Sequence, residues 1–119
     1  MLPKILIIGS TGQLGTKIIK YCTNNNILIS SITCFNNYKK MNSLAKKHKI
    51  KNKFKLSDKF EYVAFSNHIK KNKFDIIYIL DFGSESLSYV NLLIKNNKKA
   101  FISIANKELL IIAGGSKMI

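Results

Sequence analysis

Three glycines near the start of the chain have a spacing that suits the binding of an anionic group. They lie in the segment Gly9-Ser10-Thr11-Gly12-Gln13-Leu14-Gly15. The free backbone N–H groups at the beginning of a helix, together with the helix dipole, attract a phosphate without a buried counter-charge. Glycine allows a sharp turn and a close approach of the backbone to the ligand. This chemistry requires a strand before the segment and a helix after it.

The residues on either side of the glycines meet this requirement. Residues 4–8 form a short apolar run ended by a glycine, which is typical of a parallel strand covered on both faces. After the turn, apolar residues recur at helical spacing and three asparagines end the pattern: Leu14, Ile18, Ile19 and Cys22, then Asn24-Asn25-Asn26. The order of strand, turn and helix predicts the phosphate-binding turn of a dinucleotide site. A purely structural tight turn is the alternative.

Each residue of the turn has an expected role. Gly9 would let the strand reverse sharply, Gly12 would let the backbone come close to a phosphate, and Gly15 would let the helix pack tightly on the sheet. Ser10 and Thr11 would add hydroxyl groups, and the Thr11 side chain is a candidate cap for the helix.

The end of the second expected strand bears on which dinucleotide binds. An NAD-specific site places Asp or Glu there, about 20 residues after the turn, to receive the ribose hydroxyls. This sequence instead has Phe35-Asn36-Asn37-Tyr38-Lys39-Lys40. No carboxylate is present to repel a 2′-phosphate and two lysines are available to attract one, so NADPH is favoured over NADH. The alternative is that these lysines only reflect the general lysine excess.

The rest of the chain continues the alternation of strand and helix. A β-branched run over residues 27–34 completes a βαβ unit, whose two strands should be parallel neighbours. Further strands are expected at residues 54–56, 75–80 and 100–104, and helices at residues 38–48, 60–71, 87–96 and 107–113, the last ended by Gly114-Gly115. We therefore expect one domain over residues 1–119, with an α/β, Rossmann-like, doubly wound fold whose mainly parallel sheet carries helices on both faces.

Composition limits the other classes of function. Hydrophobic residues make up 46% of the 119 residues, which indicates a folded globular domain. The net charge of +14 raises the question of nucleic acid or an anionic surface, but all 20 basic residues are lysine. The arginine that bidentate phosphate and guanine contacts favour is absent. Nucleic-acid binding is therefore disfavoured, and the dense lysine stretch over residues 46–59 is interpreted as a solvated face or loop, with a binding patch as the alternative.

The cysteines and histidines show no pattern of a metal site. Cys22 and Cys34 have no CxxC partner and no metal-like spacing to His48 or His68, so reduced thiols in a cytosol-like compartment are expected. No apolar run approaches the ~20 residues needed to span a bilayer, and the N-terminus enters a strand without room for a signal peptide. The expected location is the cytoplasm, with no membrane partner.

Two motifs resemble a known enzyme family. The glycine turn of residues 9–15, and Ala105-Asn106-Lys107-Glu108-Leu109-Leu110 followed by Gly114, resemble the N-terminal domain of 1-deoxy-D-xylulose 5-phosphate reductoisomerase. The resemblance implies an oxidoreductase that uses NADPH and a divalent metal, Mg²⁺ or Mn²⁺. It implies conversion of 1-deoxy-D-xylulose 5-phosphate, a phosphorylated sugar, to 2-C-methyl-D-erythritol 4-phosphate in the non-mevalonate isoprenoid pathway.

The resemblance also assigns roles to individual residues. It implies that Thr11, Gly12, Gln13 and Leu14 contact the cofactor phosphates. Adenosine-side contacts fall on Phe35, Asn36 and Asn37, where Phe35 replaces a usual glycine and Asn36 a usual basic residue. It further implies that Asn106 and Glu108 face the nicotinamide side of the cofactor and that Lys107 contacts the substrate. The alternative for Asn106 is that it caps the helix that begins at Lys107.

The family's metal-binding carboxylates, its substrate phosphate site and its closing loop lie downstream of the position that matches Ile119. The acidic residues of this chain are scattered and do not have metal-site spacing. By itself the chain is expected to bind cofactor without turnover, as a piece of a longer protein or as the remnant of a truncated gene. A non-catalytic dinucleotide-binding module is the alternative, and the sequence is compatible with a homodimer.

A short-chain dehydrogenase has a similar glycine turn. Its catalytic pair needs a tyrosine followed four residues later by lysine. None of the five tyrosines of this chain has such a lysine. That class is therefore disfavoured.

Overall fold

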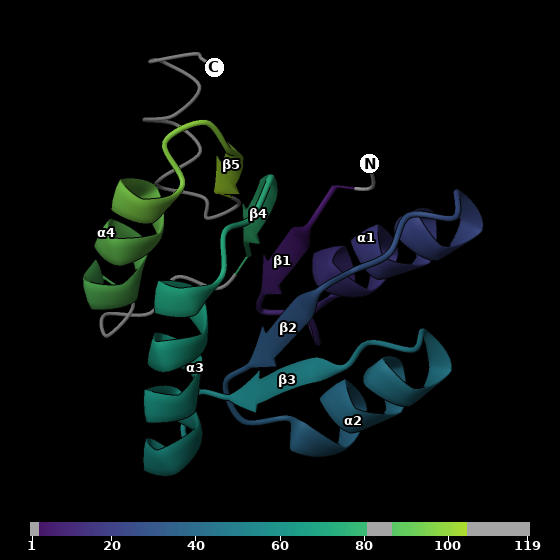
Figure 1. Ribbon diagram of the computed structural model, residues 1–119. Helices are drawn as coiled ribbons and strands as arrows, with labels where there is room; N and C mark the ends of the chain where they lie inside the picture. The colour runs from purple at the N-terminus through teal and green to yellow at the C-terminus, as the bar shows by residue number, and fades with distance from the viewer. Residues whose placement is uncertain (1–2, 81–86, 105–119) are drawn as a thin grey trace.

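The computed structural model describes residues 3–80 and 87–104, and within them strands alternate strictly with helices (Figure 1). The strands are β1 (Ile5–Ile8), β2 (Ser31–Cys34), β3 (Asn52–Lys55), β4 (Ile76–Ile79) and β5 (Phe101–Ile104). The helices are α1 (Gln13–Asn24), α2 (Tyr38–Lys47), α3 (Lys59–Lys71) and α4 (Leu87–Asn96). The helix expected at residues 107–113 lies outside the described residues.

The strands form one five-stranded sheet in the order β3-β2-β1-β4-β5, and every neighbouring pair is parallel. The chain moves outward from β1 through β2 to β3, then crosses back to β4 on the other side of β1. This reversal is the topological switch point, and in open α/β sheets ligands bind beside it, at the carboxyl ends of the strands. The expected Rossmann-like, doubly wound fold is confirmed, and the described sheet is entirely parallel.

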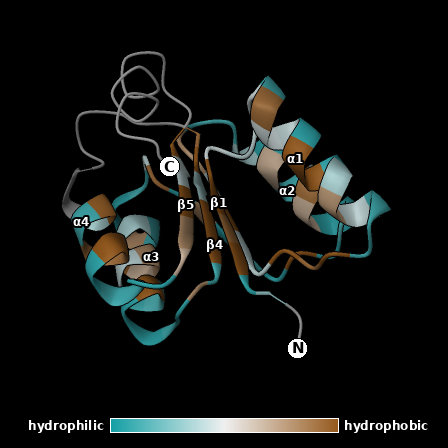
Figure 2. Cartoon of the chain, turned by 90° about the horizontal axis from the view of Figure 1, so that it is seen from above, coloured by the Kyte–Doolittle hydropathy of each residue, from teal (hydrophilic) through white to brown (hydrophobic). Residues whose placement is uncertain are grey.

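Helices cover both faces of the sheet, as Figure 2 shows from above. On one face, α1 and α2 pack against alternate strand residues such as Ile7 and Ile32 through Ile19, Met41 and Leu44. The other face is covered by α3 and α4, in a cluster that contains Leu6, Ile8, Phe65, Ile69, Ile77, Ile79 and Leu93. Because β1 is buried along its whole length on both faces, its sequence is a continuous apolar run rather than an alternating one.

Polar side chains set the ends of the helices. The Asn37 side chain accepts a hydrogen bond from the Lys40 amide at 3.2 Å at the start of α2. At the start of α3, Asp58 accepts from the Glu61 amide at 3.0 Å. The helix α1 ends within the expected asparagine run, where Asn26 adopts a left-handed φ of 57°. These local interactions therefore determine where α2 and α3 begin and where α1 ends.

The second strand is shorter than expected. The apolar stretch of residues 27–34 pairs as a strand only over Ser31–Cys34, because its register begins at Leu6 of β1 with Ser31. Residues 27–30 connect α1 to the sheet. The Ile27 amide donates a hydrogen bond to the Cys22 carbonyl near the end of α1, at 2.8 Å. Apolar composition alone therefore did not show where this segment begins to pair, and Leu28 within it is exposed.

The edge strand β3 lies within the lysine-rich stretch. Lys53 and Lys55 pair in register with Ile32 and Cys34 of β2, and all four residues of β3 are half-buried. Lysine on an edge strand discourages pairing with another chain. The lysines of this stretch thus protect an edge of the sheet as well as forming a solvated face.

Candidate functional site

The glycine turn connects the carboxyl end of β1 to the beginning of α1, as its sequence predicted. Gly9 has a φ of 88°, in the region that L side chains avoid, and it reverses the chain directly after Ile8. The next residue, Ser10, is fully buried and its hydroxyl donates to the Thr33 carbonyl at 2.9 Å. The expectation that the Ser10 hydroxyl adds to the ligand site is therefore wrong, because this hydroxyl is committed to β2.

Gly15 packs the first turn of α1 against the glycine turn. A Cβ atom at this position would lie 2.6 Å from the carbonyl oxygen of Ser10 and 2.7 Å from that of Gly9. Real side chains do not approach backbone this closely, so only glycine fits here. The expected role of Gly15 in tight helix packing is confirmed.

The helix α1 begins at Gln13 with Gly12 as its N-cap, and no side chain makes a cap hydrogen bond there. The expectation that Thr11 caps the helix is wrong, since the chain enters the helix one residue later, at Gly12, which has no capping side chain. The first N–H groups of a helix have no acceptor within it, so those of α1 are available to an anion. A Cβ atom at Gly12 would meet nothing within 4 Å, which leaves open space beside the helix N-terminus.

A hollow of about 380 Å³ lies at this edge of the sheet and joins three loops. Its lining comes from the turn after β1, the segment after β2 and the end of β4: Gly9, Thr11, Gly12, Phe35, Asn36, Asn37 and Leu80. Six of the seven are predicted cofactor contacts that are far apart in the sequence. Gln13 and Leu14 are exposed at the start of α1 and do not line the hollow, and Asn106, Lys107 and Glu108 lie outside the described residues.

Leu80 is the lining residue that the sequence analysis missed. It follows β4, is half-buried, and also packs against the core under α1 and α2. Its backbone amide donates to the Ile8 carbonyl at 2.8 Å, which places it beside the end of β1. The available signal was its position at the end of an apolar strand run, but the strand order was needed to place it near the glycine turn.

The hollow is lined by both apolar and polar residues. The Phe35 side chain, which directly follows β2, is 46% exposed. The Asn37 side-chain oxygen caps α2 by accepting a hydrogen bond from the Lys40 amide. The Asn36 side chain is exposed. Among the described residues that line the hollow there is no carboxylate, and Lys39 and Lys40 are exposed in the first turn of α2. The arrangement suits a ligand with a flat apolar part and anionic groups.

Cys34, directly before the lining residue Phe35, is a buried thiol. Burial, with a further contribution from the charge of Glu61, raises the pKa of Cys34 to about 11. Cys22 is also buried, and burial raises its pKa as well. Burial therefore favours the protonated form of both thiols over the nucleophilic thiolate.

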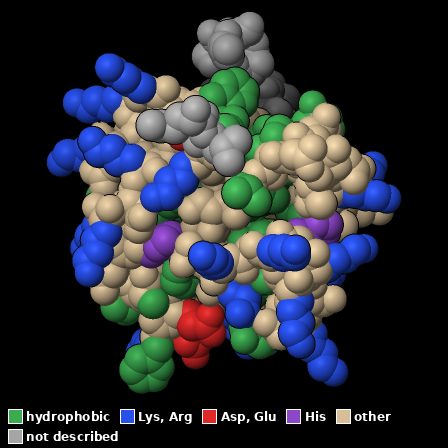
Figure 3. Space-filling view, turned by 45° about the vertical axis from the view of Figure 1, so that its right-hand side comes forward, with side chains coloured by type: hydrophobic (Ala, Val, Ile, Leu, Met, Phe, Trp, Pro, Cys, Tyr) green, Lys and Arg blue, Asp and Glu red, His purple; other side chains and the backbone are tan. Residues whose placement is uncertain are grey.

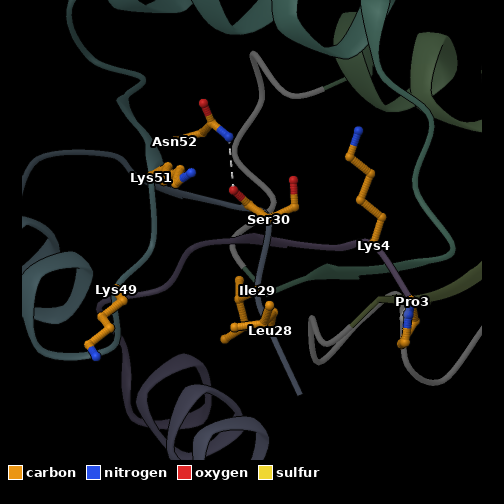
Figure 4. Close-up of a pocket in the computed structure, with 8 residues that line it drawn as sticks. All are labelled: Pro3, Lys4, Leu28, Ile29, Ser30, Lys49, Lys51 and Asn52. Atoms are coloured by element: carbon orange, nitrogen blue, oxygen red, sulfur yellow. Dashed lines mark hydrogen bonds between the residues drawn. The ribbon is translucent and has the colours of Figure 1, made fainter. Parts of the chain in front are cut away.

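A second hollow, of about 340 Å³, lies at the opposite edge of the sheet (Figure 4). It is lined by residues at the amino ends of β1, β2 and β3: Pro3, Lys4, Leu28, Ile29, Ser30, Lys49, Lys51 and Asn52. The Asn52 amide group bonds to the Ser30 carbonyl at 3.0 Å and so ties β3 to the approach of β2. Since helix N-termini in a parallel α/β sheet face the carboxyl edge, this hollow lacks the helix amides available at the first.

Residues 3–80 and 87–104 offer neither a cluster of metal ligands nor a membrane-spanning helix. Within this part of the chain, no group of three or more His, Cys, Asp or Glu residues could hold a metal ion. Among the same residues, no helix is both apolar and long enough to cross a bilayer. The lysines are spread over the face in Figure 3 and do not form a single patch there.

Comparisons with known proteins bear on this site. No family model matches the chain. It is 31% identical to 1-deoxy-D-xylulose 5-phosphate reductoisomerase from Wigglesworthia glossinidia brevipalpis, over 93% of this chain and 33% of the relative. The expected resemblance to that family is thus confirmed, and the chain spans about a third of the relative's length.

Solved structures agree with the fold. The reductoisomerase from Zymomonas mobilis, in complex with NADPH, matches with a TM-score of 0.70 at 20% identity, over 97% of this chain and 35% of that one. BdcA from E. coli matches with a TM-score of 0.50 at 15% identity, over 66% of this chain and 41% of that one. The first of these likenesses extends over nearly the whole chain and the second over two thirds of it.

Proposed function

We propose that this chain is the NADPH-binding domain of a 1-deoxy-D-xylulose 5-phosphate reductoisomerase. The observation that carries the proposal is the hollow at the switch point, which joins the glycine turn to Phe35, Asn36 and Leu80. The likeness to a reductoisomerase structure in complex with NADPH supports the same proposal. The activity, the metal and the sugar phosphate substrate are proposed for the complete enzyme.

The residues of the hollow suit the parts of NADPH in turn. The backbone around Thr11 and Gly12, with the amides of Gln13 and Leu14, would hold the diphosphate at the start of α1. Phe35 and Leu80 would flank the adenine with apolar surface, and Asn36 and Asn37 would contact the adenosine ribose. When bound, NADPH supplies the hydride for reduction of the substrate carbonyl.

The remaining predicted contacts belong to the reacting end of the cofactor. We propose that Asn106 and Glu108 contact the nicotinamide side and that Lys107 meets the phosphorylated sugar. The metal ligands would come from other parts of the complete enzyme, since the described residues offer no cluster for them. We propose that the protein is cytoplasmic. We propose no nucleic-acid or membrane partner for it.

Selectivity for NADPH follows from charge at the start of α2. None of the described lining residues is a carboxylate that would repel a 2′-phosphate, and Lys39 and Lys40 lie in the adjacent first turn of α2. An opposite charge a few ångströms from a solvent-exposed phosphate contributes about 1 kcal/mol, or about fivefold in affinity.

The test is a fluorescence titration of the purified chain with NADPH and with NADH. We expect tighter binding of NADPH, largely lost in Gly12→Val, because the new side chain would fill the open space beside the helix N-terminus. Ala64→Val, on an exposed position of α3, is the matched control and should bind as the parent chain does. Equal binding of the two cofactors, or none, would overturn the proposal.

A paired lysine experiment separates the 2′-phosphate from the rest of the cofactor. The double variant Lys39→Ala/Lys40→Ala should lose affinity for NADPH and keep its affinity for NADH. The double variant Lys46→Ala/Lys47→Ala removes the same charge from the far end of the same helix and should change neither. If the two double variants behave alike, the lysines act only through net charge and the assigned selectivity is wrong.

A further inference from the structure

The glycine turn is fastened to the neighbouring strand through one residue, Thr33 of β2. The Thr33 carbonyl accepts hydrogen bonds from the Ser10 amide at 2.8 Å, from the Ser10 hydroxyl at 2.9 Å and from the Gly9 amide at 3.2 Å. The Thr33 hydroxyl accepts a further bond from the Gly9 amide at 3.2 Å. Two consecutive peptide units of the turn are therefore held by a single residue.

Thr33 is a rigid anchor because it lies in the middle of the sheet. It pairs in register with Ile8 of β1 on one side and with Phe54 of β3 on the other, and it is fully buried. Ser10 is also fully buried, so neither hydroxyl faces the hollow. Both have partners, in keeping with the absence of any unsatisfied buried side-chain polar atom among the described residues.

Ser10 also meets the first turn of α1 on its other side. Its carbonyl oxygen lies where a side chain at Gly15 would begin, 2.6 Å from the ideal Cβ position. The strand β2 therefore holds Ser10 from one side, and the helix whose amides face the anion packs on it from the other. A shift of Ser10 would therefore change the position of the first amides of α1 relative to the segment after β2.

We propose that Ser10 and Thr33 are positioning residues for diphosphate binding: they hold the glycine turn against β2 and so fix the helix amides before the cofactor arrives. The inference rests on the proposed function of the hollow. Pre-organised donors bind an anion more tightly because little ordering remains to be done on binding. Loss of the Ser10 hydroxyl should weaken diphosphate binding about five- to tenfold, the range for one hydrogen bond.

The experiment compares two ligands by isothermal titration calorimetry on the full chain. NADPH contains the diphosphate, whereas adenosine 2′-monophosphate shares the adenosine end and lacks the diphosphate. In Ser10→Ala and Thr33→Val we expect NADPH affinity to fall about five- to tenfold while adenosine 2′-monophosphate changes less than about twofold. Thr33→Ser keeps the hydroxyl and should bind NADPH as the parent does, and Ser43→Ala on α2 is the exposed-serine control.

A merely structural role would weaken both ligands together, so equal losses, or no loss of NADPH affinity, would overturn the inference. Failure of the parent chain to bind NADPH would overturn the proposed function instead, which keeps the two claims separate. If a variant does not fold, amide hydrogen exchange on the parent chain tests whether Ser10 is held against Thr33. The Ser10 amide should then be as protected as β1 without cofactor, and exchange at the rate of an exposed loop would contradict the contact.

Discussion

The carbonyl oxygen of Ser10 lies 2.6 Å from the point where a side chain at Gly15 would begin. This relationship brings the helix α1 against the end of β1 and points its N-terminus at the hollow. It also distinguishes two glycines of the turn, because packing requires a glycine at Gly15, whereas Gly12 lines the hollow and has open space where a side chain would lie.

Gly15→Ala should destabilise the chain by about 1–3 kcal/mol, the range for forcing extra volume into a packed site. Alanine usually stabilises a helix relative to glycine by about 1 kcal/mol, so a loss here would show that the backbone contact decides the sign. Gly12→Ala is the matched comparison, and its open surroundings predict a change under about 1 kcal/mol. Urea unfolding of both variants measures the difference, and a stabilised Gly15→Ala would contradict the close packing.

Asn97→Ala should cost about 2–3 kcal/mol of stability. The buried Asn97 side chain accepts from the Phe74 amide at 2.7 Å and donates to the Leu93 carbonyl at 2.9 Å, so it joins the end of α4 to the approach of β4. Its removal leaves the buried Phe74 amide without this acceptor, whereas the Leu93 carbonyl keeps the hydrogen bond from the Asn97 backbone amide at 3.0 Å. Asn96→Ala, at the half-buried neighbour, is the control and should cost well under about 1 kcal/mol. Equal losses in thermal unfolding would show that the hydrogen bonds of Asn97 contribute nothing specific.

His68 should make the chain less stable as the pH falls below neutrality. Burial lowers the pKa of His68 from 6.5, and the charge of Lys4 lowers it further. The ring nitrogens contact the Ser31 hydroxyl at 2.7 Å and the Asn72 amide group at 3.3 Å, and the ring packs beside Phe54 and Phe74.

Because the folded pKa is below the unfolded one, the unfolded chain takes up the proton first as the pH falls. The contribution of neutral His68 to stability is therefore complete above about pH 6.5 and is lost as the pH drops through the lowered value. Urea unfolding between pH 7.5 and 5 should show a smaller decline in His68→Gln than in the parent chain. His48→Gln serves for comparison, since burial and Lys47 also lower the pKa of His48. An unchanged slope in His68→Gln would show that His68 carries no part of the effect.

Local sequence was sufficient for the elements that have strong local signals. Continuous apolar runs identified β1 and β4, and the asparagines placed the end of α1, because burial on both faces and a left-handed helix end each need particular residue types. Thr11 was wrongly predicted as a cap, since a capping hydroxyl and a hydroxyl beside a ligand look alike in sequence. The start of β2 was also misplaced, because register depends on the partner strand and not on composition.

The sequence by itself determined that a glycine turn stands between a buried strand and an amphipathic helix, and that no carboxylate follows the second strand. Only the tertiary structure decided that Leu80 joins Phe35 and Gly12 around one hollow, and that the Ser10 hydroxyl bonds to Thr33 and does not line that hollow. The physical reason is that these contacts cross between strands. Hydrogen bonds and packing between parallel strands depend on strand order and register, which residues far apart in the chain fix together.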